Sequence, residues 1–569
     1  MPRRRISKHD VDQMRKLNIF DLSGGECHSK DPDSIADNQL QQAINVEYDN
    51  VSGALKLVDG FDVVIDMPFV AKHLFYAAIF GKILACDANG TLYVADAATR
   101  ATTLVGQLNG TVPYWCSYNG KIYIASGGVL QQYDGTALSN VAQVYTYTAW
   151  QNNHAYTAGT CIINASDPSV YYECTTGGTS GSTAPAWGAT TTDGTAIWAR
   201  KSFDLTADIV FEQNGRLVIA RVGDDYLYFS GIRNASNWQF DTNEMNALRL
   251  GVNRADDCDI TAIGLLSKDI IVFKSNSSRT KNAIYHISGY YPDWTCQPLN
   301  FTFDAANKYC VLPVNNELYF MSTQGLMALH TVVEYGDIQQ TPPGAAVNSK
   351  LNVDRAAARL WLMPHKNQLW CKCANDYYLW IMHYANPNMA FTRRKLMAYQ
   401  AEAATTDGTN SYFAIGYKLY KLSPDVTREE GDWAIIGGPN ETDDIVSSAQ
   451  DVVQSFDIVA DVIPKRYTSY GQMLVKRVKY VPQQGTSGQG SVSIGHYSMP
   501  INASIAGLTI DQATEIIDMA TEFIDSGDLD QFDNIDQTNF IVDYIEPHIQ
   551  FTSGGFGMRG LLIEYAEVD

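Results

Sequence analysis

Two closely spaced thiols are the residues of this sequence best suited to chemistry, and they supply only half of a metal site. Cys371 and Cys373 alternate along an apolar run, so both side chains would point to the same face of a strand. A tetrahedral metal site needs two more ligands, and the sequence has no second cysteine pair close by. We therefore expect both thiols to pack in the core, and we predict no metal site and no cofactor.

An acidic run at 525–536 spaces its carboxylates much as a calcium-binding loop does. Leu529 and Asp530, however, stand where such a loop needs a ligand followed by glycine. Packing so many carboxylates together would be costly, so we interpret the run as a solvated loop.

Signatures of catalysis are absent from the sequence. HExxH, GxSxG and Walker patterns do not occur, and these are the usual marks of metalloproteases, hydrolases and NTPases. The segment Thr-Asp-Gly-Thr-Ala-Ile-Trp at 192–198 is similar to a sialidase Asp-box, but it occurs only once. A glycosidase also needs two facing carboxylates at a fixed separation, and the sequence singles out no such pair. We predict that the protein is not an enzyme.

Five aromatic residues that could bind a glycan gather in a short stretch rich in Thr, Gly and Ala; they are Trp150, Tyr156, Tyr172, Trp187 and Trp198. Aromatic rings stack on the flat faces of sugars, which makes glycan binding one interpretation. The alternative is that the same side chains form the core of a module of about fifty residues. We favour the core and keep glycan binding as a hypothesis.

The one concentrated positive patch is at the start of the sequence, where Arg3, Arg4 and Arg5 are followed by three further basic residues before position 17. We predict an arm that docks on an acidic neighbour or on an adjacent subunit. The alternative is a solvated, flexible arm.

The overall charge disfavours a protein that grips nucleic acid. The 569 residues include 41 Lys and Arg against 62 Asp and Glu, a formal net charge of −21, whereas phosphate binding depends on clustered cations. A hydrophobic share of 45% fits a globular protein too large for one ordinary domain. No apolar run approaches the ~18 residues of a membrane helix, and the first residues lack the apolar stretch of a signal peptide, so we expect folding in a cytoplasm.

A repeated hairpin dominates the middle of the sequence. A turn followed by a short apolar strand recurs at Gly81, Gly120, Gly215, Asp269, Asn316, Asn367 and Ser411, in steps of 39, 95, 54, 47, 51 and 44 residues. Propeller blades of four strands take ~40–50 residues. We therefore predict an all-β fold with a β-propeller over 65–424. It would have six or seven blades, because the first hairpin could instead complete the last blade; a stack of sandwich domains is the alternative.

The rest of the sequence divides around this propeller. The single long step indicates an insertion, which we assign to a small β module at 148–202. The order Trp150, Tyr156-Thr157-Ala158-Gly159, Pro185-Ala186-Trp187 and Asp193-Gly194-Thr195 resembles a small module that recurs in phage tail and virion proteins and is similar to carbohydrate-binding modules. Residues 1–64 are expected to form a connecting segment, and 425–569 a C-terminal β domain. Within that domain, helical spacing of apolar residues after a capping box predicts one amphipathic helix at about 509–524.

The stretch before the propeller resembles the opening of the tail nozzle (stabilisation or hub) proteins of short-tailed bacteriophages. The matching pieces are Ser23-Gly24-Gly25, Asp37-Asn38-Gln39, Ala43-Ile44-Asn45-Val46, Gly53-Ala54 and Gly60-Phe61. This resemblance implies a structural virion protein of the phage tail, assembled in the bacterial cytoplasm. It also implies a homohexameric ring below the portal and adaptor that retains the genome, conducts DNA during ejection, and could carry tail fibres or spikes.

The net charge of the chain suggests how DNA would move through the expected channel. Six copies at −21 would together carry about −126, and an acidic channel wall would let DNA slide without binding it. The plainer interpretation is that the acidity keeps a large protein soluble. The alternative function is that of a monomeric propeller tail protein that binds host surface glycans.

Overall fold

A computed structural model describes most of the chain. The described residues are 15–49, 53–253, 258–275, 283–290, 293–299, 303–331, 338–396, 399–431, 454–482, 488–502, 535–554 and 557–568. The basic arm with Arg3, Arg4 and Arg5 lies outside them, as do the helix expected at 509–524 and most of the acidic run. By contacts the chain divides into two compact units, 67–318 and 1–66 with 319–569, and each is described by itself.

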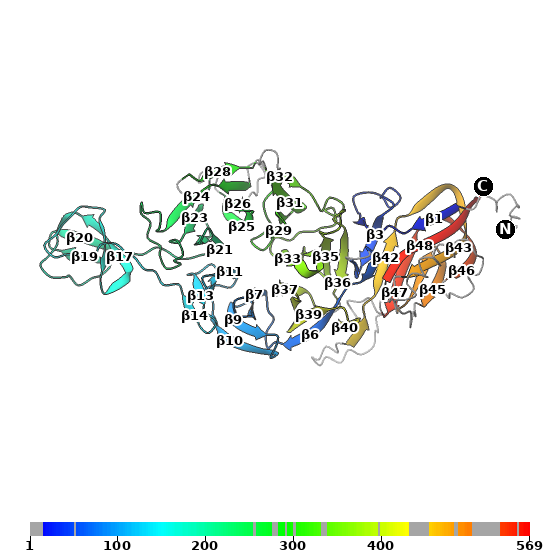
Figure 1. Ribbon diagram of the computed structural model, residues 1–569, viewed down its shortest axis with the longest axis horizontal. Helices are drawn as coiled ribbons and strands as arrows, with labels where there is room; N and C mark the ends of the chain where they lie inside the picture. Colours follow the sequence, from blue (N-terminus) through cyan, green and yellow to red (C-terminus); the bar gives the residue numbers. More distant parts are fainter. Residues whose placement is uncertain are drawn as a thin grey trace, which may run out of the picture. The chain divides into compact units, whose positions relative to one another are not determined.

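The unit 67–318 contains a succession of four-stranded antiparallel sheets (Figure 1). The first four blades have these strands: β7 (His73–Ala77), β8 (Lys82–Cys86), β9 (Thr91–Asp96) and β10 (Ala101–Gln107); β11 (Tyr114–Tyr118), β12 (Lys121–Ala125), β13 (Gln131–Tyr133) and β14 (Leu138–Asn140); β21 (Ile209–Gln213), β22 (Arg216–Ala220), β23 (Tyr226–Phe229) and β24 (Leu248–Gly251); β25 (Ile260–Leu266), β26 (Asp269–Lys274), β27 (Ile284–Ser288) and β28 (Thr295–Pro298). In each sheet the strands lie in sequence order, as in a propeller blade.

Three more groups of four antiparallel strands follow along the chain, and the second of them is part of a ten-stranded sheet. Their strands are β29 (Val311–Val314), β30 (Glu317–Ser322), β31 (Gly325–Thr331) and β32 (Ile338–Thr341); β33 (Arg359–Met363), β34 (Gln368–Lys372), β35 (Tyr378–His383) and β36 (Phe391–Lys395); β37 (Ala401–Thr406), β38 (Ser411–Ile415), β39 (Lys418–Ser423) and β6 (Gly60–Asp66). The predicted all-β propeller is thus confirmed, with seven four-stranded blades among the described residues. A single strand, β6, completes the last blade, and the first hairpin belongs to a blade of its own.

The recurring turns noted in the sequence join the first and second strands of the blades. Asn119-Gly120 and Asn214-Gly215 both have positive φ angles, between 45° and 74°, and each forms a two-residue hairpin loop. Such loops match the twist of the flanking strands, and asparagine and glycine tolerate the left-handed backbone. The Asn-Gly pairs therefore fix the register of these hairpins.

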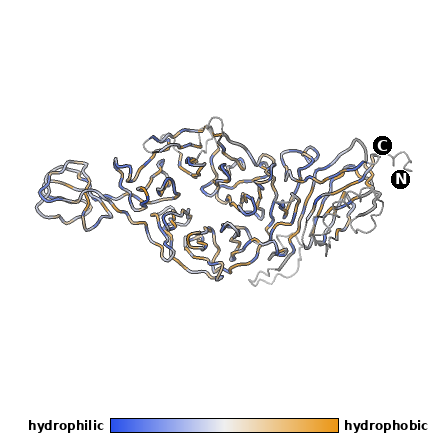
Figure 2. The backbone as a smooth tube through the Cα atoms, in the orientation of Figure 1, coloured by the Kyte–Doolittle hydropathy of each residue, from blue (hydrophilic) through white to orange (hydrophobic). Residues whose placement is uncertain are grey.

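The core of the propeller is made of apolar clusters shared by consecutive blades. Leu84 of the first blade and Ile122 of the second belong to one cluster, and Val218 of the third and Val272 of the fourth belong to another. The second strand of a blade lies between two partners and is apolar along much of its length, which Figure 2 shows as orange stretches within the blades. Because each sheet buries both faces against its neighbours, the propeller is stabilised by many similar contacts.

The insertion after β14 forms a module with its own core (Figure 1). Its strands are β15 (Ala155–Tyr156), β16 (Cys161–Asn164), β17 (Asp167–Thr176), β18 (Gly178–Thr179), β19 (Thr190–Asp193) and β20 (Ala196–Lys201). Four of them form a sheet in the order β16-β17-β20-β19, and the chain then returns to β21.

The N-terminal and C-terminal parts of the chain share two sheets. Their strands are β1 (Arg15–Ile19), β2 (Gly25–Glu26), β3 (Gln39–Ile44), β4 (Val46–Tyr48), β5 (Leu55–Leu57), β40 (Arg428–Gly431), β41 (Gln454–Asp457), β42 (Ala460–Pro464), β43 (Tyr467–Pro482), β44 (Gln489–Ile494), β45 (Tyr497–Asn502), β46 (Ile535–Ile545), β47 (Pro547–Ser553) and β48 (Gly557–Val568). β1 and β5 pair with β48, while β3 lies between β36 and β42; β40 and β41 form a hairpin of their own.

This pairing corrects the expected division of the chain. The sequence separates a connecting segment at 1–64 from a C-terminal domain at 425–569, whereas their strands form common sheets and one apolar core. Partners that lie more than 400 residues apart leave no local pattern, which is why the sequence does not show the pairing. The described helical structure is one short 3-10 turn, Pro364–Lys366, and no helix within the described ranges has the length and apolar character needed to cross a membrane.

Candidate functional site

Three of the five aromatic residues proposed for glycan binding lie inside the module. Trp198 is fully buried, and Tyr156 and Tyr172 are 8% and 3% exposed. Trp150 and Trp187 are half-buried and pack against the same cluster. The structure brings the five together as parts of one core, with the Tyr172 and Trp187 ring centroids 4.4 Å apart. They do not form a continuous exposed platform.

The Asp-box-like segment supplies the polar centre of this core. Asp193 is 3% exposed, and its Oδ2 accepts hydrogen bonds from the indole Nε1 of Trp150 at 2.7 Å and of Trp198 at 3.3 Å. Its Oδ1 accepts a hydrogen bond from the Gly181 amide at 2.7 Å. A buried carboxylate is tolerated when donors surround it in this way. Asp193 therefore holds two strand ends and two indoles together, which is a structural role.

Replacing Asp193 by alanine should unfold the module and leave the blades intact. Each buried donor left unpaired costs about 1–3 kcal/mol, which is a large share of the stability of so small a core. Hydrogen exchange should accelerate in β17 and β20 and stay unchanged in β12 and β22. Asp167→Ala, at a half-exposed position of the same module, is the control. Unchanged protection of β17 and β20 in the Asp193 variant would refute this role.

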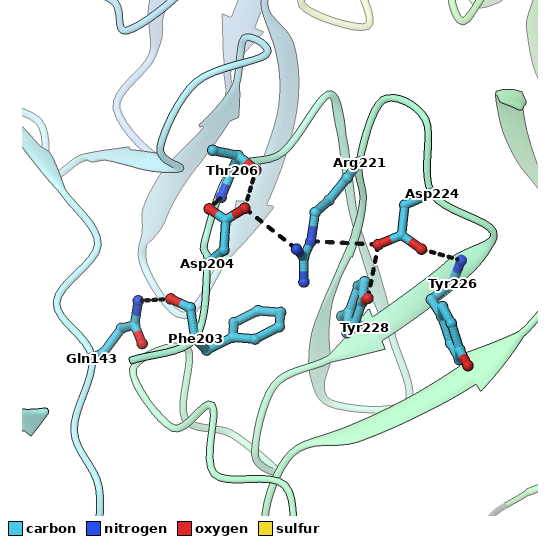
Figure 3. Close-up of polar contacts among 8 residues, drawn as sticks. All are labelled: Gln143, Phe203, Asp204, Thr206, Arg221, Asp224, Tyr226 and Tyr228. Atoms are coloured by element: carbon cyan, nitrogen blue, oxygen red, sulfur yellow. Dashed lines mark hydrogen bonds and ion pairs between the residues drawn. The ribbon is translucent and has the colours of Figure 1, made fainter. Parts of the chain in front are cut away.

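Polar and aromatic contacts fix the base of the module to the third blade; we call Phe203, Asp204, Arg221, Asp224 and Tyr228 the root (Figure 3). The Arg221 guanidinium carbon lies 4.5 Å and 4.2 Å from the ring centroids of Phe203 and Tyr228. Its nitrogens lie 3.4 Å from Asp204 Oδ2 and 3.8 Å from Asp224 Oδ2. Burial raises the pKa of Tyr228 to about 12, so its hydroxyl stays protonated and donates to Asp224.

The two chain segments that carry the module are joined to each other as well. Gln143 on the outgoing segment donates from Nε2 to the carbonyl of Phe203 on the returning one, at 2.7 Å (Figure 3). Tyr145 accepts a hydrogen bond from the Phe203 amide at 2.7 Å, and its ring lies 4.8 Å from that of Tyr171 in β17. These contacts and the root therefore hold the module through side chains, in addition to the two covalent links of the chain.

The N-terminal residues that resemble phage nozzle proteins meet β36 and the C-terminal strands; we call Gly25, Glu26, Asn45, Arg393 and Arg394 the clasp. Glu26 is fully buried and accepts hydrogen bonds from the Ala43 amide at 2.6 Å and Arg393 Nε at 2.9 Å. Gly25 has a φ of 66°, and a Cβ there would lie 2.4 Å from the Phe391 nitrogen. A side chain at position 25 would therefore force the N-terminal segment away from β36.

Asn45 is the central residue of the clasp. It is 2% exposed, has a φ of 57°, and donates from Nδ2 to the Val459 carbonyl at 2.8 Å. Its Oδ1 accepts from Arg394 Nη1 at 3.1 Å and from the Lys395 amide at 2.8 Å. One side chain thus joins the N-terminal segment, the sixth blade and the residue that precedes β42. The sequence motif marks this position, but only the structure shows its partners.

Buried lysines join different elements within each unit. In 67–318, Lys308 Nζ lies 2.9 Å from the carbonyls of Val112 and Asp208 and 2.7 Å from Asp208 Oδ1, so it bridges segments that lead into β11, β21 and β29. In the other unit, Lys366 Nζ lies 2.7 Å from both Glu47 Oε2 and Asp59 Oδ2. These pairs were not predicted, because lysine and acid residues far apart in sequence carry no local signal.

The two thiols of the apolar run lie in β34 and directly after it. Cys371 and Cys373 are both buried, as the core interpretation expects. In the part of the chain that the structure describes, no group of three His, Cys, Asp or Glu side chains is placed to hold a metal ion.

Comparisons with known proteins assign the chain to no family. No family model matches the chain, and no curated protein matches it either. Similar solved structures include the β-propeller domain of Cps50 (Swd1) from Myceliophteria thermophila, at 8% identity and a TM-score of 0.38, covering 64% of this chain and 99% of that one. YCF48 from Cyanidioschyzon merolae, at 8% identity and a TM-score of 0.36, covers the same shares. The WD40 propeller domain of Doa1 has 10% identity and a TM-score of 0.35, over 64% and 98% of the two chains. The propeller assignment itself rests on the sheets described above.

Proposed function

We propose that this protein is a structural subunit of a bacteriophage tail, forming a homohexameric nozzle below the portal and adaptor. The observation that supports it best is the clasp. Its N-terminal members, Gly25, Glu26 and Asn45, lie in or directly beside the stretch that resembles nozzle proteins, and each has a specific structural task. Motif residues that also make such contacts support the nozzle proposal better than sequence similarity alone.

The buried charges support a scaffold over an enzyme. Lys308 and Lys366 each bind partners from other elements of their own unit. Asp193, the carboxylate of the Asp-box-like segment, is used by two indoles and an amide. These groups hold elements together, and a subunit that must withstand a packaged genome needs such cross-links.

The net charge fits a channel through which DNA slides. In a ring of six, a total of about −126 would repel phosphate, so that DNA would pass without being bound. The charge map of the ring's inner surface is therefore part of the proposal. A basic inner wall would argue against it.

Native mass spectrometry of the purified full-length protein tests the ring. We expect an assembly of six times 62.9 kDa, and six-fold rings in negative-stain images, with or without the adaptor present. A second sample that lacks residues 1–16 distinguishes a docking arm from a solvated one. Loss of the ring would show that the arm is needed for assembly, whereas an unchanged ring would favour a solvated arm. A strict monomer in the presence of adaptor would contradict the nozzle and favour the monomeric glycan-binding tail protein.

A further inference from the structure

A cavity lies between the third and fourth blades, inside the unit 67–318. It has a volume of about 180 Å³, and its lining includes Gln213 and Asn214 from one hairpin turn and Lys268 from the next. Tyr290 and Trp294, from the segment between β27 and β28, also line it. The Gln213 amide donates to the Lys268 carbonyl, which ties the two turns together at this site.

Arg216, the buried cation in the lining, forms its hydrogen bonds with backbone carbonyls. Arg216 is 7% exposed and lines the cavity, and among the described residues its guanidinium donates to carbonyl oxygens and forms no ion pair within 4 Å of a carboxylate. Nη1 donates to the carbonyls of Ser230 and Asn246, both at 2.6 Å, and Nη2 donates to that of Glu244. A guanidinium has five N–H groups, so these three bonds leave two for another acceptor.

The buried charge of Arg216 is therefore only partly compensated. Burial lowers the pKa of its guanidinium, although the negative charges that Tyr118 and Glu244 can carry act in the opposite direction. Carbonyl dipoles stabilise a cation less than an anion does. Lys268, which is exposed at the rim, adds a second positive charge to the same cavity. Glu244 also lines the cavity, so two cations face one carboxylate there, and the remaining single positive charge favours a ligand with one negative charge.

The apolar part of the lining is flat and aromatic. Trp294 stacks on Phe229, with ring centroids 4.7 Å apart and an interplanar angle of 28°. Tyr290 is 61% exposed at the opening. Aromatic rings give large, rigid contact areas, and the amides of Gln213 and Asn214 can both donate and accept hydrogen bonds. An apolar floor with amides and a cation suits a ring that has one flat face and polar groups at its edge.

We propose that this cavity binds a single acidic sugar unit, with its carboxylate on Arg216 and Lys268 and its flat face on the aromatic side chains. Pockets for drug-sized ligands have volumes of about 300–1,000 Å³, so a cavity of about 180 Å³ suits one ring-sized unit. Guanidinium groups bind carboxylates through two parallel hydrogen bonds, and the two uncommitted N–H groups of Arg216 permit that contact. This site is separate from the aromatic residues of the inserted module, and the proposal does not depend on the nozzle function.

Ligand-observed NMR titrations of the full-length protein test the proposal. The probes are methyl glucuronoside, methyl glucoside and N-acetylglutamate, which separate the carboxylate from the sugar ring. We expect the glucuronoside to bind at least about tenfold more tightly than the glucoside, since a charge-assisted pair contributes about 1.4 kcal/mol or more. It should also bind more tightly than N-acetylglutamate, which has carboxylates but no ring to lie on the aromatic side chains. Equal binding of the two glycosides, no binding of the glucuronoside, or preference for N-acetylglutamate would overturn the proposal.

Two variants and a control locate the binding. Lys268→Glu, at an exposed position, should weaken glucuronoside binding about tenfold without unfolding the blade. Trp294→Ala should weaken it through the loss of the aromatic surface, and its circular dichroism spectrum checks that the fold is kept. Lys350→Glu makes the same charge change at an exposed position that does not line the cavity, and should bind as the unmodified protein does. Binding unaffected by Lys268→Glu would contradict the site.

Discussion

Replacing Asn45 by alanine should lower the free energy of unfolding of the unit formed by 1–66 and 319–569 by about 3–5 kcal/mol. The change leaves the Lys395 amide and the Val459 carbonyl without their partner, and each buried polar group left unpaired costs about 1–3 kcal/mol. Alanine at a φ of 57° adds backbone strain of about 1 kcal/mol. Urea unfolding measures the total, and hydrogen exchange in β3, β36 and β42 shows where the loss occurs.

Two controls separate the side chain from the backbone. Asn45→Gly keeps the left-handed backbone accessible and removes only the hydrogen bonds, so it should recover about 1 kcal/mol relative to alanine. Asn119→Ala places alanine at a φ of 45° in an exposed hairpin turn, where it adds the same kind of strain and removes one exposed hydrogen bond, from Nδ2 to the Arg233 carbonyl at 3.0 Å. If Asn45→Ala were no more destabilising than Asn119→Ala, the clasp would not have the role assigned to it.

Replacing Lys366 by methionine should destabilise the same unit by about 3–5 kcal/mol at neutral pH, because it leaves the buried carboxylate of Glu47 without its nearest cation. Glu47 is 1% exposed, and Lys366 Nζ lies 2.7 Å from its Oε2. Lys56→Met is the matched control, since Lys56 contacts the same carboxylate at 3.2 Å from a position that is 36% exposed. That control should cost about 1 kcal/mol or less.

The effect of Lys366→Met should depend on pH. Burial by itself would raise the pKa of Glu47, but the charges of Lys366 and Lys56 and hydrogen bonds from Lys366 and Gln368 outweigh it, and the pKa lies below its ordinary value of 4.5. A carboxyl with a lowered pKa stabilises the fold fully above its unfolded value, and this contribution is lost as the pH falls through the folded value. The gap between the two proteins should therefore be largest above pH 4.5 and shrink in acid. A gap that does not change with pH would contradict the role of the ion pair.

A compensating variant tests the same network from the other side. Glu47→Gln combined with Lys366→Met removes the buried charge together with its partner and should recover most of the lost stability. No recovery would show that the cost of Lys366→Met comes from packing and not from the unpaired carboxylate.

The repeated hairpins show why the propeller could be predicted from sequence. Asn119-Gly120 and Asn214-Gly215 specify two-residue loops locally, and the apolar strands that follow them specify burial. The strand β6 also illustrates the limit of this reasoning. Its pairing with β39 joins residues some 350 positions apart, and no local pattern indicates which strand completes the last blade.

The sequence predicts a candidate site only where the residue types themselves indicate a function. The aromatic residues of the module were identified, yet their alternation does not say that Trp198 is buried while Trp150 is half-exposed. The cavity near Arg216 was not identified, because its lining comes from two blades and its cation pairs with carbonyls that any sequence provides. Hydrogen bonds to backbone carbonyls cannot be predicted from residue types, because every residue has a carbonyl.

The position of the protein in an intact virion tests the central proposal most directly. The proposal predicts that cryo-electron microscopy of virions that contain this chain shows it as a six-fold ring on the tail axis, beyond the portal and adaptor. Its inner wall should be acidic and its N-terminal clasp folded against the C-terminal strands. Single copies away from the axis, or a ring with a basic inner wall, would contradict the account.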